Sequence, residues 1–332
     1  MKFIYPEKLR SGDEVRAVAA ARSRALIGRE SRQIAAERFE ALGLKLTFGE
    51  HVDEQDMFGS SSVKSRVEDL HAAFSDKNVK AVLTVIGGYN SNQLLDYIDW
   101  SVIKNNPKIF CGFSDITALC NAIYAQTGLV TYYGPHYSTF GQKLHFNYTL
   151  EYFKKCLLSG APFEVLPSKD WSDDLWFMNQ NERQLAANPG WQVLNEGEAK
   201  GTLLGGHLGT FGLLFGTAYM PEFSQPTILL AEEDSSSGKL TDVEFDRRLQ
   251  ALIQQPGFNK VKGLLIGRFQ KASEMTAEKL QKIIKTKAAL AKMPVVAGLD
   301  FGHTDPKVTL PIGGQAALVA KVGQAMLIIE RH

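Results

Sequence analysis

The chain has 332 residues, of which 44% are hydrophobic and 22% charged, with a formal net charge of +1. This is the composition of a globular protein, and the length exceeds what one hydrophobic core usually holds, so we expect two domains. The balanced charge and the lack of a long apolar stretch argue against a nucleic-acid partner, a signal peptide or a membrane span.

Strands and helices alternate in the first half of the sequence. Short apolar runs predict strands, and apolar residues at helical spacing predict helices. Strands are expected at residues 14–20, 44–48, 81–86 and 109–111, and helices at residues 30–42, 63–74, 89–98, 117–124 and 148–158. This alternation predicts an α/β fold with a parallel sheet of the Rossmann or flavodoxin-like kind. Ligands of such folds bind at the carboxyl ends of the strands.

The second half of the sequence does not continue this regular alternation. Residues 166–190 are polar and contain Trp171 and Trp176, and we interpret them as a linker or a mobile flap. A glycine-rich run at residues 200–207 then precedes a helix at 208–215. Further strands are expected at residues 227–231, 261–266, 295–298, 308–310, 316–320 and 325–329, and helices at residues 242–255 and 277–290.

The sequence therefore predicts three parts. An N-terminal α/β domain covers residues 1–165, the linker or flap covers residues 166–190, and a β-rich, barrel-like C-terminal domain covers residues 191–332.

Ser114 occupies a turn between a predicted strand and a predicted helix. Gly112 and Phe113 separate it from the strand, and the helical pattern begins at Thr117. A serine on such a turn is held clear of the sheet, and the N–H after it lies where negative charge is favoured. Serine is also a good helix N-cap, and Ile116 stands where the G-x-S-x-G motif has its second glycine. This segment alone leaves both a nucleophile and a simple cap open.

Two glycines, Gly87 and Gly88, end the strand at residues 81–86. Their N–H groups can stabilise an oxyanion, and the alternative is a tight turn that needs glycine for its backbone angles. No P-loop sequence follows them, so they do not form a phosphate loop of that kind.

A nucleophilic serine needs a base, and the base needs an orienting acid. The histidines in polar loops, on predicted helix surfaces and at the C-terminus are set aside, which leaves His136, His207 and His303. His303 lies in a loop just after a predicted strand. Glu232 ends a buried strand, where a carboxylate needs a partner. The chain order Ser114, Glu232, His303 is that of α/β-hydrolases.

Cysteine and histidine spacing gives no metal site. Cys111, Cys120 and Cys156 lie in apolar strand or helix patterns, and an odd number without framework spacing indicates reduced thiols in the cytoplasm. No H-x-x-x-H or C-x-x-C spacing occurs. We therefore expect neither a metal nor a cofactor.

Several strings resemble those of the LD-carboxypeptidase family of serine peptidases. They are IGGYNSNQLL at residues 86–95, GFSDITAL at 112–119, YGP at 133–135, GGHL at 205–208, ILLAEED at 228–234 and GHTDP at 302–306. The resemblance covers nearly the whole chain. It is closest to the microcin C immunity branch, whose members carry the Gly-Gly-x-Asn-Ser-Asn string seen here.

The resemblance implies a catalytic triad of Ser114, Glu232 and His303, with an oxyanion hole made by the N–H groups of Gly88 and Asp115. It also implies an active site between an α/β domain and a β-rich domain, and a homodimer.

Predicted substrate contacts are Trp171, His207 and Asn90. Trp171 matches an aromatic residue that stacks on a nucleobase in the immunity branch, although packing of a loop tryptophan is the alternative. His207 stands where the family typically has asparagine, and Ser236 stands where the immunity branch has a lysine.

Four functions remain open at this point. The first is cleavage of an amide in a peptidyl- or aminoacyl-nucleotide, and the second is removal of the terminal D-alanine from a murein tetrapeptide. A small-molecule-binding protein without chemistry and an ordinary esterase are the others, because a fold does not determine function.

Overall fold

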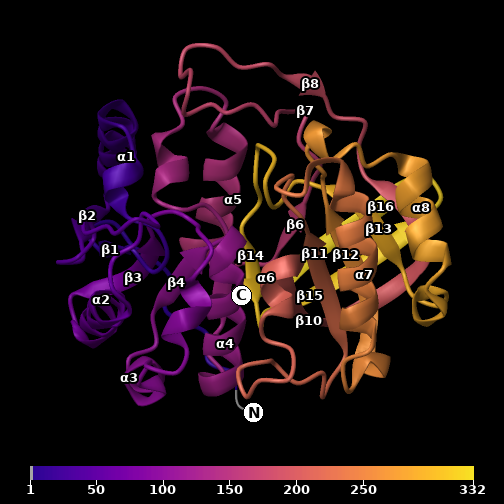
Figure 1. Ribbon diagram of the computed structural model, residues 1–332, viewed down its shortest axis with the longest axis horizontal. Helices are drawn as coiled ribbons and strands as arrows, with labels where there is room; N and C mark the ends of the chain where they lie inside the picture. Colours follow the sequence, from indigo (N-terminus) through magenta and orange to yellow (C-terminus); the bar gives the residue numbers. More distant parts are fainter. Residues whose placement is uncertain (1–2) are drawn as a thin grey trace.

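Two β-sheets, each with its own helices, lie side by side in the molecule (Figure 1). The computed structural model describes residues 3–332. The first sheet has the strand order β14-β5-β4-β3-β1-β2, in which all neighbours are parallel except β14 and β5. Its strands are β1 (Glu14–Val18), β2 (Lys45–Phe48), β3 (Val79–Thr84), β4 (Ile109–Gly112), β5 (Thr131–Tyr133) and β14 (Leu310–Ile312). The predicted α/β fold with a parallel sheet is confirmed.

The second sheet has eight strands in the order β6-β16-β15-β10-β11-β12-β13-β9. They are β6 (Phe163–Val165), β9 (Gln192–Asn195), β10 (Gly197–His207), β11 (Thr227–Glu232), β12 (Val261–Gly267), β13 (Val295–Leu299), β15 (Gln315–Lys321) and β16 (Gln324–Arg331). The central strands β10 to β13 are parallel, and the flanking pairs are antiparallel. The edge strand β9 also approaches β15 and β16. The predicted β-rich C-terminal part is confirmed.

The helices cover the two sheets. Those of the first half are α1 (Arg29–Ala41), α2 (Val63–Ser75), α3 (Trp100–Asn105), α4 (Thr117–Thr127) and α5 (Asn147–Leu157), and those of the second half are α6 (Leu208–Gly212), α7 (Thr241–Ile253) and α8 (Ala277–Lys285). Helix α2 packs on β1 and β3, and α4 packs on β4 and β5. No helix within residues 3–332 has the length and apolar character needed to cross a membrane.

Two strands lie in the sheet of the other half of the chain. Strand β14 comes late in the sequence but pairs with β5 of the first sheet, and β6 comes before the flap but pairs with β16 of the second. Each is only three residues long, so its own apolar pattern contains no information about its partner. The chain therefore crosses between the two sheets more often than a division at residues 165 and 191 indicates.

Three predicted helices are shorter than expected. The segment at residues 89–98 contains only a 3-10 helix at Ser91–Leu94, and the N–H groups of Asn90 and Ser91 at its start donate to the side chain of Asp115. Helix α6 ends at Gly212, and α8 ends at Lys285 with a separate 3-10 turn at Ala288–Leu290.

A polar contact holds the two halves together beside the site. The side-chain amide of Asn121 on α4 donates to the carbonyl of Gly205 and accepts from its N–H, at 2.9 and 3.0 Å. Gly206 has φ +135°, and a Cβ there would lie 2.7 Å from the ring of Tyr133. A glycine at this position therefore allows β10 to approach the first sheet closely.

Candidate active site

Ser114 lies on a strained turn at the carboxyl end of β4. The strand ends at Gly112, and a 3-10 helix (Ser114–Ile116, η3) leads directly into α4. The φ of Ser114 is +61°, a left-handed conformation that costs a non-glycine residue about 1–3 kcal/mol. Its side chain caps no helix N–H within the described residues, and Oγ instead lies 2.9 Å from Nε2 of His303. The turn therefore presents the hydroxyl to an imidazole.

His303 joins Ser114 to a buried carboxylate. Its Nδ1 lies 2.8 Å from Oε2 of Glu232, which ends β11 and is 1% exposed. Burial acts to raise the pKa of Glu232, but the charge of His303 and its hydrogen bond outweigh burial and hold that pKa below its usual value. Burial acts to lower the pKa of His303, but Glu232 holds it above its usual value. The three side chains have the geometry that a Ser–His–acid triad requires.

Tyr133 connects the acid to the turn that carries Ser114. It lies beside Gly112 in the pairing of β5 with β4. Its hydroxyl donates to Oε1 of Glu232 at 2.6 Å and accepts from the backbone N–H of Ser114 at 3.2 Å. Burial, followed by the charge of Glu232, raises the pKa of Tyr133 well above its usual value, so the hydroxyl stays protonated. This side chain therefore orients both Glu232 and the nucleophile.

We expect Tyr133→Phe to lower kcat by about 10- to 100-fold, which is the effect of losing one hydrogen bond to a charged group. Without this donor the charge on Glu232 is less dispersed and holds His303 protonated more strongly. The acidic limb of the pH profile of kcat should therefore move to higher pH. Tyr132→Phe is the matched control, because the hydroxyl of Tyr132 contacts Lys8 rather than the triad. An unmoved limb in Tyr133→Phe would contradict this role.

The predicted oxyanion donors belong to two loops that are linked by Asp115. Its Oδ2 accepts from the N–H groups of Asn90 and Ser91 at 3.0 and 2.9 Å, and its carbonyl accepts from Oγ of Ser91 at 2.7 Å. Within residues 3–332, neither the N–H of Gly88 nor that of Asp115 donates to another protein group. Both N–H groups are therefore free for a ligand.

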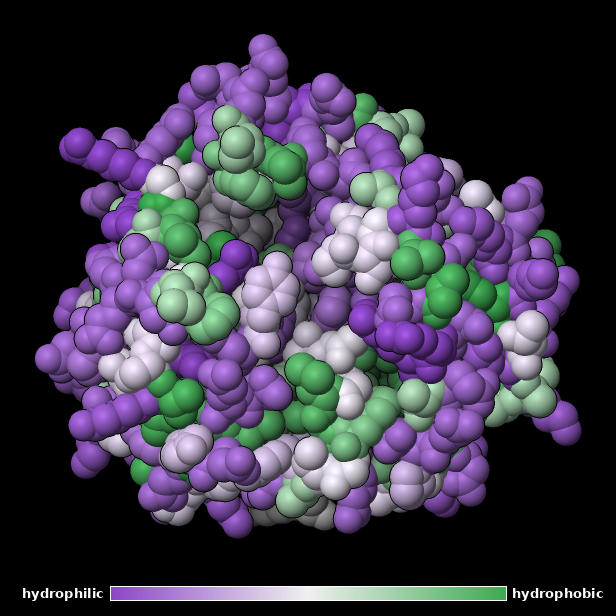
Figure 2. Space-filling model, in the orientation of Figure 1, coloured by the Kyte–Doolittle hydropathy of each residue, from purple (hydrophilic) through white to green (hydrophobic). Residues whose placement is uncertain are grey.

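A cavity of about 270 Å³ opens onto Ser114. Aromatic side chains from both halves and from the flap line it: Tyr89, Phe113, His136, Trp176, Phe177 and His303. Arg22, Asp234 and Lys307 are its charged lining residues. Figure 2 shows that this face of the molecule is hollowed between the two halves, with apolar residues on the segment that crosses above the hollow. The cavity can therefore hold a ligand with an apolar or planar part.

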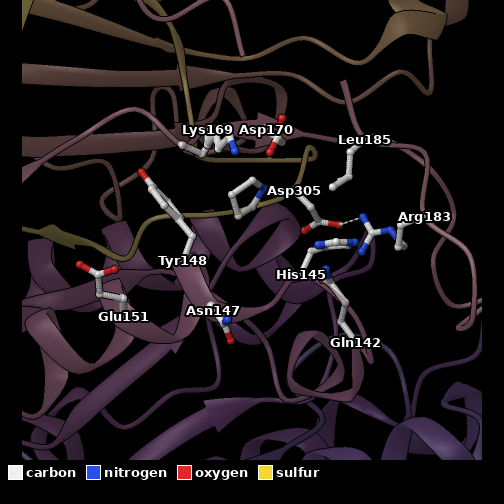
Figure 3. Close-up of a pocket in the computed structure, with 12 residues that line it drawn as sticks. Gln142, His145, Asn147, Tyr148, Glu151, Lys169, Asp170, Arg183, Leu185 and Asp305 are labelled. Carbon is white, nitrogen blue, oxygen red and sulfur yellow. Dashed lines mark hydrogen bonds and ion pairs between the residues drawn. The ribbon is translucent and has the colours of Figure 1, made fainter. Parts of the chain in front are cut away.

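A separate cavity of about 470 Å³ lies against the loop that follows His303 (Figure 3). Asp305 and Pro306 line it together with Arg183 of the flap, and Arg183 contacts Asp305 at 3.3 Å. The backbone of Ser172 also pairs with that of Asp305. These contacts tie the flap to the loop that carries His303. No cluster of three or more metal-binding side chains occurs in the part of the chain that the structure describes.

The three predicted substrate contacts lie outside the lining of the Ser114 cavity. Trp171 forms a two-residue strand, β7 (Asp170–Trp171), which pairs with β8 (Ala186–Ala187), and its ring faces Arg268 and Lys271 at about 5 Å.

His207 caps α6 by accepting from the N–H of Thr210, and its ring centroid lies 5.4 Å from that of His303. The side chain of Asn90 accepts from Arg66 and donates to Ser60, which holds the loop after Gly88. Contact of Trp171, His207 and Asn90 with a substrate therefore stays a prediction.

Several residues of the site escaped the sequence analysis. Tyr133 was noted only as part of a motif, because the pairing of β5 with β4 decides that its hydroxyl meets Glu232. Phe177, Arg22 and Lys307 carry no motif, because loops far apart in the sequence bring them to the cavity.

Comparison with known proteins matches both halves of the chain. Residues 15–134 match the LD-carboxypeptidase N-terminal domain, and residues 200–318 match the LD-carboxypeptidase C-terminal domain. The crystal structure of an MccF-like protein from Bacillus anthracis is 49% identical, covers 99% of this chain and 100% of its own, and superimposes with a TM-score of 0.98.

The microcin C7 self-immunity protein MccF of Escherichia coli is 32% identical over 85% of this chain and 83% of its own. Its structure with aspartyl sulfamoyl adenosine has a TM-score of 0.87 at 28% identity, covering 99% of each chain. The murein tetrapeptide carboxypeptidase of Pseudomonas aeruginosa is 24% identical over 85% of this chain and 86% of its own. The chain therefore belongs to the LD-carboxypeptidase family, and it is a hydrolase of the serine carboxypeptidase type.

Proposed function

We propose that this protein is a serine peptidase that cleaves an amide bond in a peptidyl- or aminoacyl-nucleotide of the microcin C type. The observation that carries the proposal is the hydrogen-bonded series Glu232, His303 and Ser114, whose hydroxyl opens onto a cavity with an aromatic lining.

In this mechanism Nε2 of His303 takes the proton of Ser114 as Oγ attacks the carbonyl carbon. Glu232 and Tyr133 hold the imidazole in the orientation that leaves Nε2 free to accept. His303 then gives the proton to the leaving nitrogen, and water releases the acyl group from Ser114 by the same steps in reverse.

The N–H groups of Gly88 and Asp115 are the proposed oxyanion donors. Each such donor is typically worth about 3–4 kcal/mol of transition-state stabilisation. Two observations support this. Neither N–H donates to a protein acceptor within the described residues, and the Asp115 side chain fixes the two loops relative to each other.

The aromatic lining supports a nucleotide substrate. Trp176, Phe177 and Tyr89 offer flat apolar surfaces beside Ser114, and such rings stack well on a nucleobase. MccF, which is similar along most of its length, has been solved with aspartyl sulfamoyl adenosine. Ser236, which stands where the immunity branch has a lysine, hydrogen-bonds Asp234 at the edge of the cavity. Ser236 therefore does not supply the positive charge that the lysine has in that branch.

Removal of the terminal D-alanine from a murein tetrapeptide is the second candidate. Arg22 lines the cavity, donates Nε to the carbonyl of Gly87 and forms no ion pair within residues 3–332. A guanidinium in this state suits a terminal carboxylate. A relative of 24% identity is a murein tetrapeptide carboxypeptidase.

Product analysis by mass spectrometry tests these functions. The protein and its Ser114→Ala variant are incubated separately with aspartyl sulfamoyl adenosine and with a murein tetrapeptide. Cleavage of the nucleotide analogue by the unmodified protein alone is the expected result, and cleavage of the tetrapeptide alone would select the second candidate. Turnover by neither protein, together with no adduct of a serine-directed phosphonate at Ser114, would favour a binding protein. Turnover of 4-nitrophenyl esters without any amide would favour an esterase.

A further inference from the structure

His136 is a buried histidine of the cavity that the triad does not use. It lies 2% exposed, and its ring stacks on that of Phe113 with centroids 4.3 Å apart. Its Nε2 is buried and has no hydrogen-bond partner in the described residues. A buried polar atom without a partner is costly, so a ligand that supplies the missing hydrogen bond is favoured at this point.

The other ring nitrogen determines what Nε2 can offer. The hydroxyl of Thr84 donates to the carbonyl of Cys111 at 3.2 Å, and its oxygen lies 2.8 Å from Nδ1 of His136. A hydroxyl has one hydrogen, so the two contacts together require that Nδ1–H donates to Thr84. Nε2 then carries a lone pair and acts as an acceptor.

The surroundings keep the imidazole neutral. Burial lowers the pKa of His136 well below its usual value, and the charges of Lys307, His303 and Arg22 lower it further. Nε2 therefore remains unprotonated near neutral pH and can accept a hydrogen bond from a substrate.

Gly87 leaves open the space between this acceptor and the nucleophile. A Cβ added to Gly87 would lie 3.2 Å from Oγ of Ser114 and 3.4 Å from Nε2 of His136. Both atoms therefore border one space, which an atom of the substrate next to the attacked carbonyl can reach.

We propose that Nε2 of His136 accepts a hydrogen bond from the N–H of the scissile amide. This inference rests on the proposed peptidase function and adds a preference for amides that carry a hydrogen over esters of the same acid. Holding this N–H on one side leaves the lone pair that develops on nitrogen free to take the proton that His303 donates.

The test compares hydrolysis of matched amides and esters. One pair is a murein tetrapeptide and its analogue with D-lactate in place of the terminal D-alanine. The other is N-acetyl-aspartyl 4-nitroanilide and the corresponding 4-nitrophenyl ester. His136→Asn retains an amide near the position of Nδ1, where it can contact Thr84, and removes the acceptor at Nε2. We expect this variant to lower kcat/KM for the amide of each cleaved pair by about 10- to 100-fold and for the ester by less than about 3-fold.

Two further variants guard against a purely structural effect. His136→Gln brings an amide oxygen near the position of Nε2 and should recover part of the amide turnover. Thr84→Val removes the group that holds Nδ1–H without changing the imidazole, and it should also lower the amide rate selectively. His71→Asn is the matched control, because His71 accepts from Asp99 on the surface, away from the cavity.

The outcomes separate this inference from the function on which it rests. Equal losses for amide and ester, or no loss for either, would overturn the role of His136 and leave the peptidase function intact. A protein that cleaves neither amide and also leaves aspartyl sulfamoyl adenosine intact would overturn the peptidase function and this inference with it.

Discussion

Replacing Ser114 with alanine is expected to lower kcat by about 10⁶-fold, the effect of removing the nucleophile from a serine peptidase. The same change should alter the free energy of unfolding by less than about 1 kcal/mol. Within residues 3–332, Oγ has a hydrogen bond with His303 alone, and it caps neither η3 nor α4. The left-handed backbone at this position is retained with alanine, so the strain of the turn stays the same.

Ser62→Ala is the matched control for the alternative that Ser114 is only a helix cap. Ser62 does cap a helix, because its Oγ accepts from the N–H of Ser65 at the start of α2. Its removal should cost about 1 kcal/mol of stability and leave kcat unchanged. Urea denaturation and steady-state kinetics on both variants measure the two effects. A Ser114→Ala protein that keeps its activity would contradict the assignment of Ser114 as the nucleophile, and one that loses stability as Ser62→Ala does would show that Ser114 also stabilises its helix.

The sequence contained enough information to predict which residues meet at the site. Ser114 follows β4 of the first sheet and Glu232 ends β11 of the second, and residues that bind ligands in such folds lie at the carboxyl ends of parallel strands. His303 follows β13, the second neighbour of β11 in the same sheet. Periodicity and chain order made these three side chains candidates, and the resemblance to the LD-carboxypeptidase family implied that they form one triad.

Contacts that depend on the pairing of short segments could not be predicted from the sequence. Strand β14 is three residues long, and only the structure shows that it completes the first sheet rather than the second. The contribution of the flap's tryptophans to the cavity could not be predicted for the same reason. Trp171 and Trp176 are five positions apart in one polar segment, and the pairing of β7 with β8 decides which of them reaches the cavity.

The role of Tyr133 was hidden for another reason. Its neighbour Tyr132 has the same side chain and nearly the same burial, but alternation along β5 sends the two hydroxyls to opposite sides. Choosing between them requires the register of β5 against β4. Local patterns do not encode that register, so the second partner of Glu232 emerges only from the fold.

Glu232→Gln is expected to lower kcat by about 10³- to 10⁴-fold and to move the acidic limb of its pH profile to lower pH. In the unmodified protein Glu232 holds the pKa of His303 above its usual value, so activity falls as the pH drops through this raised pKa and the imidazole becomes protonated. Glutamine has the same shape but no charge. Burial then dominates and lowers the pKa of His303, so the remaining activity persists to a lower pH.

Glu14→Gln is the control that shows whether removing a buried carboxylate elsewhere in the protein has the same effect on kcat and its pH profile. Glu14 is also buried and paired with a cation, Arg16, and its pKa is likewise held below its usual value, but it lies at the amino end of β1. Its replacement should lower stability and leave both kcat and the acidic limb unchanged. The decisive measurement is kcat from pH 5 to 9 for the three proteins. A limb that stays in place in Glu232→Gln would mean that another group sets the ionisation of His303, because within residues 3–332 Glu232 is the one carboxylate that hydrogen-bonds its imidazole.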